Sequence, residues 1–428
     1  MLVSFTVENV YSFYDAQTLN ARAVATCKER REEATFAPFA GRKGRLVKTL
    51  AVYGANASGK SNIFYALAGM RENVLHSASE ATARAPLRGI PFLFSADGPV
   101  RPSSCTLEFI VGDAQYKYGY SIMGERVVGE FLLRKSARGK RYDELFSRTT
   151  RGTEDLVSVA PAFGADELVI SKRRTNALLL STCAMLSVPE AMKVADYFAW
   201  RINVVAAARL SPNHTARQIA DGRHRDEIIR FLRMTDPGIG GVEVTASDRE
   251  TGRLLADGTK EHAVVYEPQV RPMLKEGGVS ERALPMDMIA SLGTIKAFSL
   301  ASYVFEALDA GTVLVLDELD SRLHPLLTRE IIRLFNQTET NPKNAQLVFN
   351  THDTNLLGVR TYNPTTKKRE YMLRRDEIYF VEKNGEMCSK IYSLIDFRKE
   401  GKSVRNDASY EKDYLEGLYG AIPYLGWK

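Results

Sequence analysis

The stretch that decides the fold of this 428-residue chain is Gly54-Ala55-Asn56-Ala57-Ser58-Gly59-Lys60-Ser61. It matches the pattern Gly-x-x-x-x-Gly-Lys-Ser, in which the glycines allow a tight loop whose N–H groups surround a phosphate. Residues 50–53 form an apolar run that predicts a buried strand, and residues 62–67 open a helical pattern. This order of strand, loop and helix is what a phosphate-binding loop requires. The alternative is a turn of small residues that matches by accident.

The side chains at the end of this loop have expected contacts. Lys60 would reach the β- and γ-phosphates of ATP, and the hydroxyl of Ser61 would be a ligand of Mg²⁺. The glycines would let the backbone and the following helix N-terminus approach the phosphates. The predicted cofactor-binding residues of this segment are Gly54, Asn56, Gly59, Lys60, Ser61 and Asn62.

A second pair of motifs lies in residues 291–318. Ser291 and Gly293 precede an apolar helical stretch at 295–308, and a helix N-terminus there favours an anion, although an ordinary N-cap has the same residues. Residues 312–316 are apolar and end in Asp317 and Glu318, as in a buried parallel strand that delivers carboxylates at its C-terminal end. We expect Asp317 to hold Mg²⁺ and Glu318 to polarise the attacking water.

A further buried strand is predicted at residues 345–350, and it ends in Thr-His-Asp. A single histidine is usually structural. His352, however, follows the C-terminal end of a predicted core strand, where the other candidate groups converge. We therefore predict two catalytic residues, Glu318 and His352, and two metal-binding residues, Ser61 and Asp317.

Composition excludes several classes of protein. No apolar run is long enough to span a bilayer, and the first eight residues alternate like a strand and do not resemble a signal peptide, so we expect a cytoplasmic protein without membrane contact. The four cysteines are far apart, which favours neither a zinc site nor a disulfide framework. The net charge of +6 permits contact with nucleic acid without arguing for it.

The pattern along the chain divides it into three parts. Residues 1–133 are predicted to form an N-terminal ATPase lobe with the phosphate loop and an antiparallel β-layer, which includes strands at 104–111, 115–122 and 126–133. Residues 134–236 read as an inserted, mainly helical subdomain, and residues 237–428 as a C-terminal ATPase lobe. We interpret the charged residues 28–33 as a solvated loop.

The predicted insertion is rich in basic side chains. They could form one surface for nucleic acid or for an acidic partner, although such charges more often solvate helix faces. The residues concerned are Lys172, Arg173, Arg174, Arg217, Arg223, His224, Arg225, Arg230 and Arg233.

The order of these motifs resembles the ATPase heads of the ABC superfamily, in the branch of SMC, RecF and OLD-like proteins. Residues 319–325, Leu-Asp-Ser-Arg-Leu-His-Pro, resemble the D-loop of that branch. The resemblance implies an α/β ABC-type P-loop head, in which Ser291 and Gly293 belong to a signature that contacts the γ-phosphate held by another subunit, and in which His352 is the switch histidine.

The same resemblance makes three residues of the first turn candidates for contacts on the adenine side, with edge packing as the alternative: Asn9, Ser12 and Phe13. Such heads also carry a glutamine that touches Mg²⁺. Gln115 is the nearest candidate, but an exposed strand residue is the better interpretation.

Residues 374–383, 392–397 and 414–423 resemble the closing segments of the RloA/AbiL-like ATPases of bacterial anti-phage and abortive-infection loci, and the ATPase component of the PARIS defence system is similar. This implies a homo-oligomer with ATP between subunits, a separately encoded effector such as a TOPRIM-type nuclease, and a phage-encoded trigger. The sequence itself has no nuclease constellation. The alternative is a RecF/SMC-like DNA-repair ATPase that binds DNA directly.

Overall fold

A six-stranded sheet forms the centre of the computed structural model, which describes residues 1–39, 44–79, 87, 89–152, 154–206, 210–254, 260–363, 366–399 and 401–423. The strands, in spatial order, are β11 (Ile202–Val205), β15 (Val313–Leu316), β16 (Gln346–Asn350), β5 (Thr49–Tyr53), β19 (Ile378–Lys383) and β20 (Ser389–Ser393). All neighbours are parallel except β19 and β20. The carboxyl ends of β5, β15 and β16 therefore lie at one edge of this sheet.

Both faces of the central sheet are buried, which explains the continuous apolar runs in its strands. Alternate residues point to opposite faces. Leu50 and Val52 of β5 belong to one hydrophobic core, while Ala51 and Tyr53 belong to the other. The predicted buried strands before the phosphate loop and before Asp317 are thus confirmed.

The first core lies between the central sheet and a seven-stranded antiparallel sheet, with α2 (Lys60–His76) packed in it. The strands of this sheet are, in spatial order, β10 (Glu154–Val159), β9 (Asp143–Arg151), β8 (Arg126–Ser136), β7 (Ala114–Met123), β6 (Ser103–Val111), β1 (Leu2–Glu8) and β2 (Gln17–Asn20). The predicted α/β architecture, with a mixed sheet beside an antiparallel layer, is confirmed.

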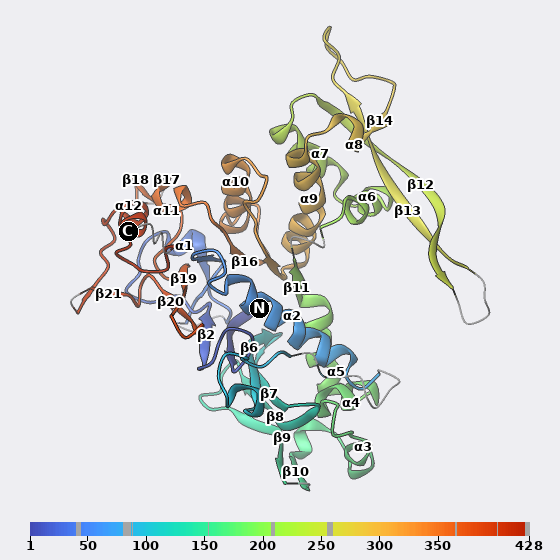
Figure 1. The fold of residues 1–428 in the computed structure, drawn as a ribbon. Coiled ribbons are helices and arrows are strands. Elements are labelled where there is room, and N and C mark those ends of the chain that lie inside the picture. Colours follow the sequence, from blue (N-terminus) through green and yellow to red (C-terminus); the bar gives the residue numbers. More distant parts are fainter. Residues whose placement is uncertain are drawn as a thin grey trace.

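The second core is covered by helices and by a long β-hairpin that projects from the body of the molecule (Figure 1). Helix α9 (Leu292–Ala310) packs against α6 (Pro212–Ala220) and α7 (Arg225–Thr235). The hairpin consists of β12 (Ile239–Leu254) and β13 (Lys260–Pro272), with β14 (Leu284–Pro285) beside it.

Shorter elements complete the fold. Helices α10 (Pro325–Asn336), α11 (Asn355–Gly358) and α12 (Tyr410–Leu415) belong to the C-terminal part. Small two-stranded pairs are formed by β3 (Thr35–Phe36) with β4 (Leu46–Val47), β17 (Arg360–Asn363) with β18 (Lys368–Tyr371), and β21 (Arg398–Lys399) with β22 (Lys402–Ser403). The remaining helices are α1 (Arg31–Ala34), α3 (Glu167–Ser171), α4 (Leu179–Met185), α5 (Pro189–Asp196) and α8 (Met286–Ile289), with a π-helical turn at Tyr197–Arg201.

Residues 134–236 contain more strand than the sequence pattern predicts. β9 and β10 extend the antiparallel sheet, and β11 is the edge strand of the central sheet. β11 was not predicted, because it has only four residues between the helical residues 189–201 and α6 and is too short to give a periodic signal. The three-part division of the chain stays a prediction.

The basic residues of 172–233 do not form one surface, which leaves the preferred interpretation, that they solvate separate helix faces. Lys172, Arg173 and Arg174 follow α3, at the end of the molecule that carries the antiparallel sheet, whereas Arg217, Arg230 and the other basic residues of α6 and α7 lie at the opposite end (Figure 1). Several of these arginines make local contacts: Arg173 pairs with Asp155, for example.

In the part of the chain that the structure describes, no helix is both long and apolar enough to cross a membrane.

Candidate nucleotide site

The loop between β5 and α2 has a backbone that requires glycine at both ends. Gly54 has a φ of +151° and Gly59 a φ of +108°, in the region that L side chains rarely adopt. A Cβ atom on Gly59 would lie 2.5 Å from Oγ of Ser389 and 2.6 Å from Oγ of Ser12. The loop is therefore held tightly against two other parts of the chain. The first N–H groups of α2 have no partners inside the helix and face this loop.

Lys60 is buried at the start of α2, and its Nζ donates 2.8 Å hydrogen bonds to the carbonyl oxygens of Gly54 and Ala55. Burial lowers the pKa of this ammonium group to about 8, while Asp317, Asp320 and Glu318 oppose that shift. The cation is thus held inside the loop, where an anionic ligand would neutralise it.

Ser61 and Asp317 meet across the carboxyl edge of the sheet. The hydroxyl of Ser61 donates a 2.8 Å hydrogen bond to Oδ1 of Asp317. Tyr65, one turn along α2, donates from its Oη to Oδ2 of the same carboxylate at 3.2 Å. A hydroxyl and a carboxylate are oxygen ligands of the kind that Mg²⁺ prefers. The structure thus brings together the two residues predicted to bind the metal ion.

Asn350, at the end of β16, joins the two acidic residues that follow β15. Its Nδ2 donates to Oδ1 of Asp317, and its Oδ1 accepts from the N–H of Glu318, each at 2.5 Å. A weaker 3.4 Å contact runs from Nδ2 to Oγ of Ser61. Sequence reasoning missed Asn350, as it missed Tyr65. The signal was a polar residue at the end of an otherwise apolar strand, one position before Thr-His-Asp.

Glu318 has a left-handed backbone, with φ of +53°, and an exposed side chain. Its carbonyl oxygen accepts a 2.7 Å hydrogen bond from Nζ of Lys296, which lies on α9 and also donates to the carbonyl of Leu319 at 3.3 Å. Burial lowers the pKa of Lys296 to about 8. The turn after β15 is therefore held by β16 on one side and by α9 on the other.

His352 lies beside this cluster. Its backbone N–H donates a 3.1 Å hydrogen bond to Oδ2 of Asp320. Partial desolvation and then the positive charge of Lys60 lower the pKa of the imidazole, while the nearby carboxylates oppose the shift. The residue is exposed, and its lowered pKa keeps the imidazole neutral at neutral pH. Asp320 is a site residue to which the sequence analysis assigned no role.

Ser291 and Gly293 lie at the N-terminal end of α9. Ser291 is exposed and caps α9, since its Oγ accepts from the N–H of Thr294 at 3.1 Å. Leu292, between them, is 64% exposed. No described contact links this N-terminus to Lys60 or Ser61. A Cβ on Gly293 would lie 2.8 Å from the carbonyl oxygen of Arg322, so glycine here also lets the helix approach residues 319–325.

The other predicted contacts divide into two groups. Asn62 donates a 2.8 Å hydrogen bond to Oγ of Ser12, which also contacts Ser389, so both residues support the loop. Asn56 lies exposed at the tip of the loop. Asn9 is buried and bonded to the backbone of Gly98 and Arg101, and Phe13 is buried in the core. For these last two the packing interpretation is correct.

Gln115 is a buried residue of β7 rather than an exposed one, and its amide nitrogen lies 3.5 Å from Oε1 of Glu108. Its burial corrects the expectation of a solvent-facing strand residue: this side chain contacts a glutamate of the neighbouring strand β6. Within the described residues, nothing connects it with the loop.

These residues fit a nucleotide with Mg²⁺. The loop needs glycine, encloses a buried cation, and precedes the N-terminus of a 17-residue helix. Lys60 and the loop amides would hold the phosphates, and Ser61 and Asp317 would hold the metal ion. The bound metal would withdraw charge from the phosphates.

The model of one protein family, described as "AAA domain, putative AbiEii toxin, Type IV TA system", matches residues 50–181 and 276–358. These two segments make up half of the chain and contain the phosphate loop, Asp317, Glu318 and His352. The chain belongs to this AAA family. Every residue placed above at the carboxyl edge, from β5, β15 and β16, lies within the matched segments.

Solved structures with a similar fold include the SMC head domain from Thermotoga maritima, which is 14% identical, has a TM-score of 0.40, and is matched over 92% of this chain and 98% of that chain. The recombination mediator protein RecF with ATP is 11% identical, has a TM-score of 0.32, and is matched over 91% of this chain and 97% of that chain. No curated protein matches this chain.

Asn350→Ala is expected to reduce ATP turnover by about tenfold to a hundredfold, because it frees the N–H of Glu318 and lets the adjacent carboxylate move. Binding of ATP is expected to change little, since Lys60 and the loop remain. Steady-state turnover and equilibrium binding measure the two effects. Asn355→Ala, a change in the same segment but at an exposed position bonded to Asp353, is the matched control. Wild-type turnover in a folded Asn350→Ala protein contradicts the positioning role.

ATP affinity is expected to fall as the pH rises from 7 to 9. Lys60 is protonated below its pKa of about 8 and neutral above it, and only the ammonium form attracts phosphate. Arginine stays charged over this range, so Lys60→Arg is expected to remove most of the pH dependence even where it weakens binding. Binding titrations of both proteins at several pH values test this. If the ATP affinity of both proteins falls equally with pH, the titrating group is not Lys60.

Proposed function

We propose that this protein binds and hydrolyses ATP with Mg²⁺ as the ATPase subunit of a bacterial anti-phage system of the RloA/AbiL-like kind. The observation that supports it most is the meeting of Ser61 and Asp317 at 2.8 Å, with Glu318 next in the chain and Lys60 one residue before Ser61. In this arrangement Lys60 neutralises phosphate charge and Glu318 accepts a proton from the attacking water. His352 contributes a neutral imidazole at the same edge.

The proposal of a separate effector rests on the family and on the chain itself. The description of the family names a putative toxin of a toxin–antitoxin system. Among the described residues, no group of three or more His, Cys, Asp or Glu side chains could hold a metal ion of the kind a nuclease uses. We therefore infer that the toxic output comes from another protein, such as a TOPRIM-type nuclease, that this ATPase holds and releases when a phage-encoded trigger appears.

We also propose that the ATP site is completed by a second copy of the chain. Ser291, Leu292 and Gly293, the signature, are unpaired with their own loop, and the exposed Leu292 lies between the two polar positions. A C₂ pair that places each signature over the partner's loop would bury Leu292 in both copies. Direct DNA binding has less support, because the basic residues of 172–233 do not form one surface.

Two substitutions separate binding from turnover. Lys60→Ala is expected to abolish detectable ATP binding. Glu318→Gln keeps the shape of an exposed side chain and is expected to retain ATP while lowering turnover by at least about a hundredfold. Phosphate release and nucleotide-binding titrations measure these outcomes. Turnover at the wild-type rate in the glutamine variant shows that Glu318 is not the catalytic base.

Pairing is tested on Glu318→Gln protein, where ATP persists. Sedimentation with and without ATP is expected to give a larger species only with ATP, and Leu292→Asp is expected to abolish it by burying a charge near phosphate. Leu292 is a better test position than Gly293, whose substitution would push against Arg322 of the same chain. Leu415→Asp, at a similarly exposed leucine on α12, is the control. A monomer in both states, or equal loss in the control, argues against this interface.

A further inference from the structure

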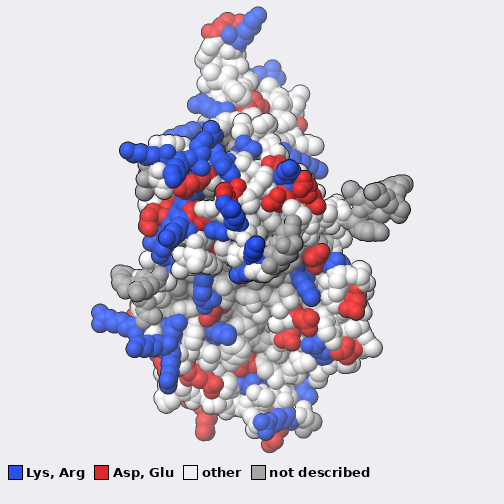
Figure 2. Space-filling model, turned by 90° about the vertical axis from the view of Figure 1, so that its left-hand side faces the viewer, with Lys and Arg blue, Asp and Glu red and all other residues white. Residues whose placement is uncertain are grey.

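A groove of about 1540 Å³ lies outside the nucleotide site, between α10, the segment around α1, and the β17–β18 hairpin. Its described lining residues include seven lysines or arginines and four glutamates. The face of the molecule shown in Figure 2 likewise carries basic and acidic side chains close together. The sequence interpretation of residues 28–33 as a solvated loop is wrong in part, because the side chain of Arg30 is buried in the groove wall.

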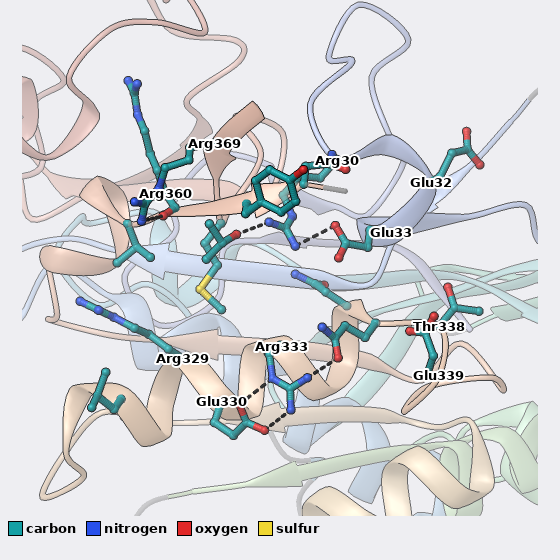
Figure 3. A pocket seen from close by; sticks show the side chains of 18 of the residues that line it. Arg30, Glu32, Glu33, Arg329, Glu330, Arg333, Thr338, Glu339, Arg360 and Arg369 are labelled. Atoms are coloured by element: carbon teal, nitrogen blue, oxygen red, sulfur yellow. Dashed lines mark hydrogen bonds and ion pairs between the residues drawn. The ribbon is translucent and has the colours of Figure 1, made fainter. Parts of the chain in front are cut away.

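Among the charged groove residues labelled in Figure 3, Arg329, Arg360 and Arg369 lie toward one end, and Glu32 and Glu339 lie toward the other. Lys28 and Arg31 line the groove as well, and Glu32 pairs with Arg45 at 3.3 Å. Between them the charges are paired. Arg30 contacts Glu33, and Arg333 contacts Glu330.

The arginines at the first end have no carboxylate partner among the described residues. The guanidinium of Arg329, on α10, has no hydrogen-bond or ion-pair partner among the described residues, and its Nε is buried without a partner. Arg360 is held by Tyr371, whose ring lies 4.3 Å from the guanidinium carbon and whose hydroxyl accepts a 2.8 Å hydrogen bond. Arg369 donates only to the carbonyl oxygen of Arg360, at 3.2 Å. A guanidinium held in this way is prepared for a bidentate carboxylate.

Apolar side chains also line the groove and remain exposed. Leu326 is 62% exposed and Tyr362 is 61% exposed, and Met234 is exposed as well. A nucleic-acid backbone makes little contact with apolar side chains. Its continuous negative charge would also be repelled by Glu32 and Glu339 at the second end. A polypeptide, in contrast, can present acidic, apolar and basic side chains in turn.

We propose that this groove binds an extended segment of a second protein, with acidic side chains at the arginine end and apolar side chains against Leu326 and Tyr362. The inference rests on the proposed function and specifies the chemistry by which a partner is held. The groove is linked to the candidate nucleotide site through the chain, because His324 lines it and follows residues 320–323, of which Asp320 contacts His352. A bound partner would therefore touch α10, the helix that follows this segment.

The probe is a short fluorescent peptide with alternating glutamate and leucine in one half and two lysines at the other end. Anisotropy titration with the full chain, without nucleotide, is expected to show saturable binding. Arg329→Glu and Arg369→Glu are each expected to weaken it by at least about tenfold, the value of one lost charge-assisted pair. Arg151→Glu, at an exposed position of β9 on the distant antiparallel sheet, is expected to leave it unchanged.

A charge swap excludes damage to the fold as the cause. The peptide with lysine in place of glutamate is expected to bind Arg369→Glu protein better than the original peptide does, since Arg369 is exposed and its change should leave the structure intact. No binding by the wild type up to millimolar peptide, or no response to the substitutions, overturns the proposal. Tighter binding of single-stranded DNA of equal length, lost in the same variants, would identify nucleic acid as the occupant.

The test is independent of the ATPase proposal. None of the substituted arginines belongs to the nucleotide site, so turnover is expected to be unchanged in these variants. A protein that hydrolyses ATP but ignores the peptide leaves the proposed ATPase intact and removes the groove. A protein that binds the peptide without hydrolysing ATP supports the groove and contradicts the proposed ATPase activity.

Discussion

The hydrogen bonds of Asn350 hold the functional edge of this molecule together. β5, β15 and β16 end side by side, and each is followed by a turn that carries a polar group. Asn350, which is buried, contacts the carboxylate of Asp317 and the backbone of Glu318 at once. Because a left-handed residue other than glycine costs free energy, the conformation of Glu318 needs such external support. Lys296 of α9 provides further support, because its Nζ donates a hydrogen bond to the carbonyl oxygen of Glu318.

This support links the site to two further parts of the molecule, α9 and the groove beside α10. Lys296 belongs to the first turns of α9, whose N-terminus carries the signature that would contact a second copy under the proposed pairing. Residues 319–325 touch both Gly293 and the groove beside α10. A shift of α9 on ATP binding would therefore be felt at Glu318 and at the groove wall together. Such a coupling requires that the partner and ATP prefer the same arrangement of α9 and α10.

The sequence predicted the parts of the site that depend on local pattern. The glycine loop, the apolar strand before Asp317 and Glu318, and the strand before His352 each carry their signal within ten residues, and all three strands lie where expected. Asn350, Tyr65 and Lys296 were not predicted, because their importance depends on which element lies opposite them. An asparagine at a strand end has no distinguishing pattern until the neighbouring strand is known to end in two acids.

The same distinction explains why the basic residues of 172–233 do not form one surface. A count of charges along the segment allows one patch as an alternative, but β11 runs through its middle and anchors it in the central sheet. Residues on either side of β11 are therefore carried to opposite ends of the molecule. The groove shows the converse case, since its walls come from residues 28–33, 324–339 and 359–372, which are far apart in sequence. Its charge separation exists only in the folded chain: the arginine end combines one residue of α10 with two of the β17–β18 hairpin, and a polyanion that fits that end must also pass Glu32 and Glu339. That constraint, rather than the number of basic residues, is what favours a polypeptide over a nucleic acid.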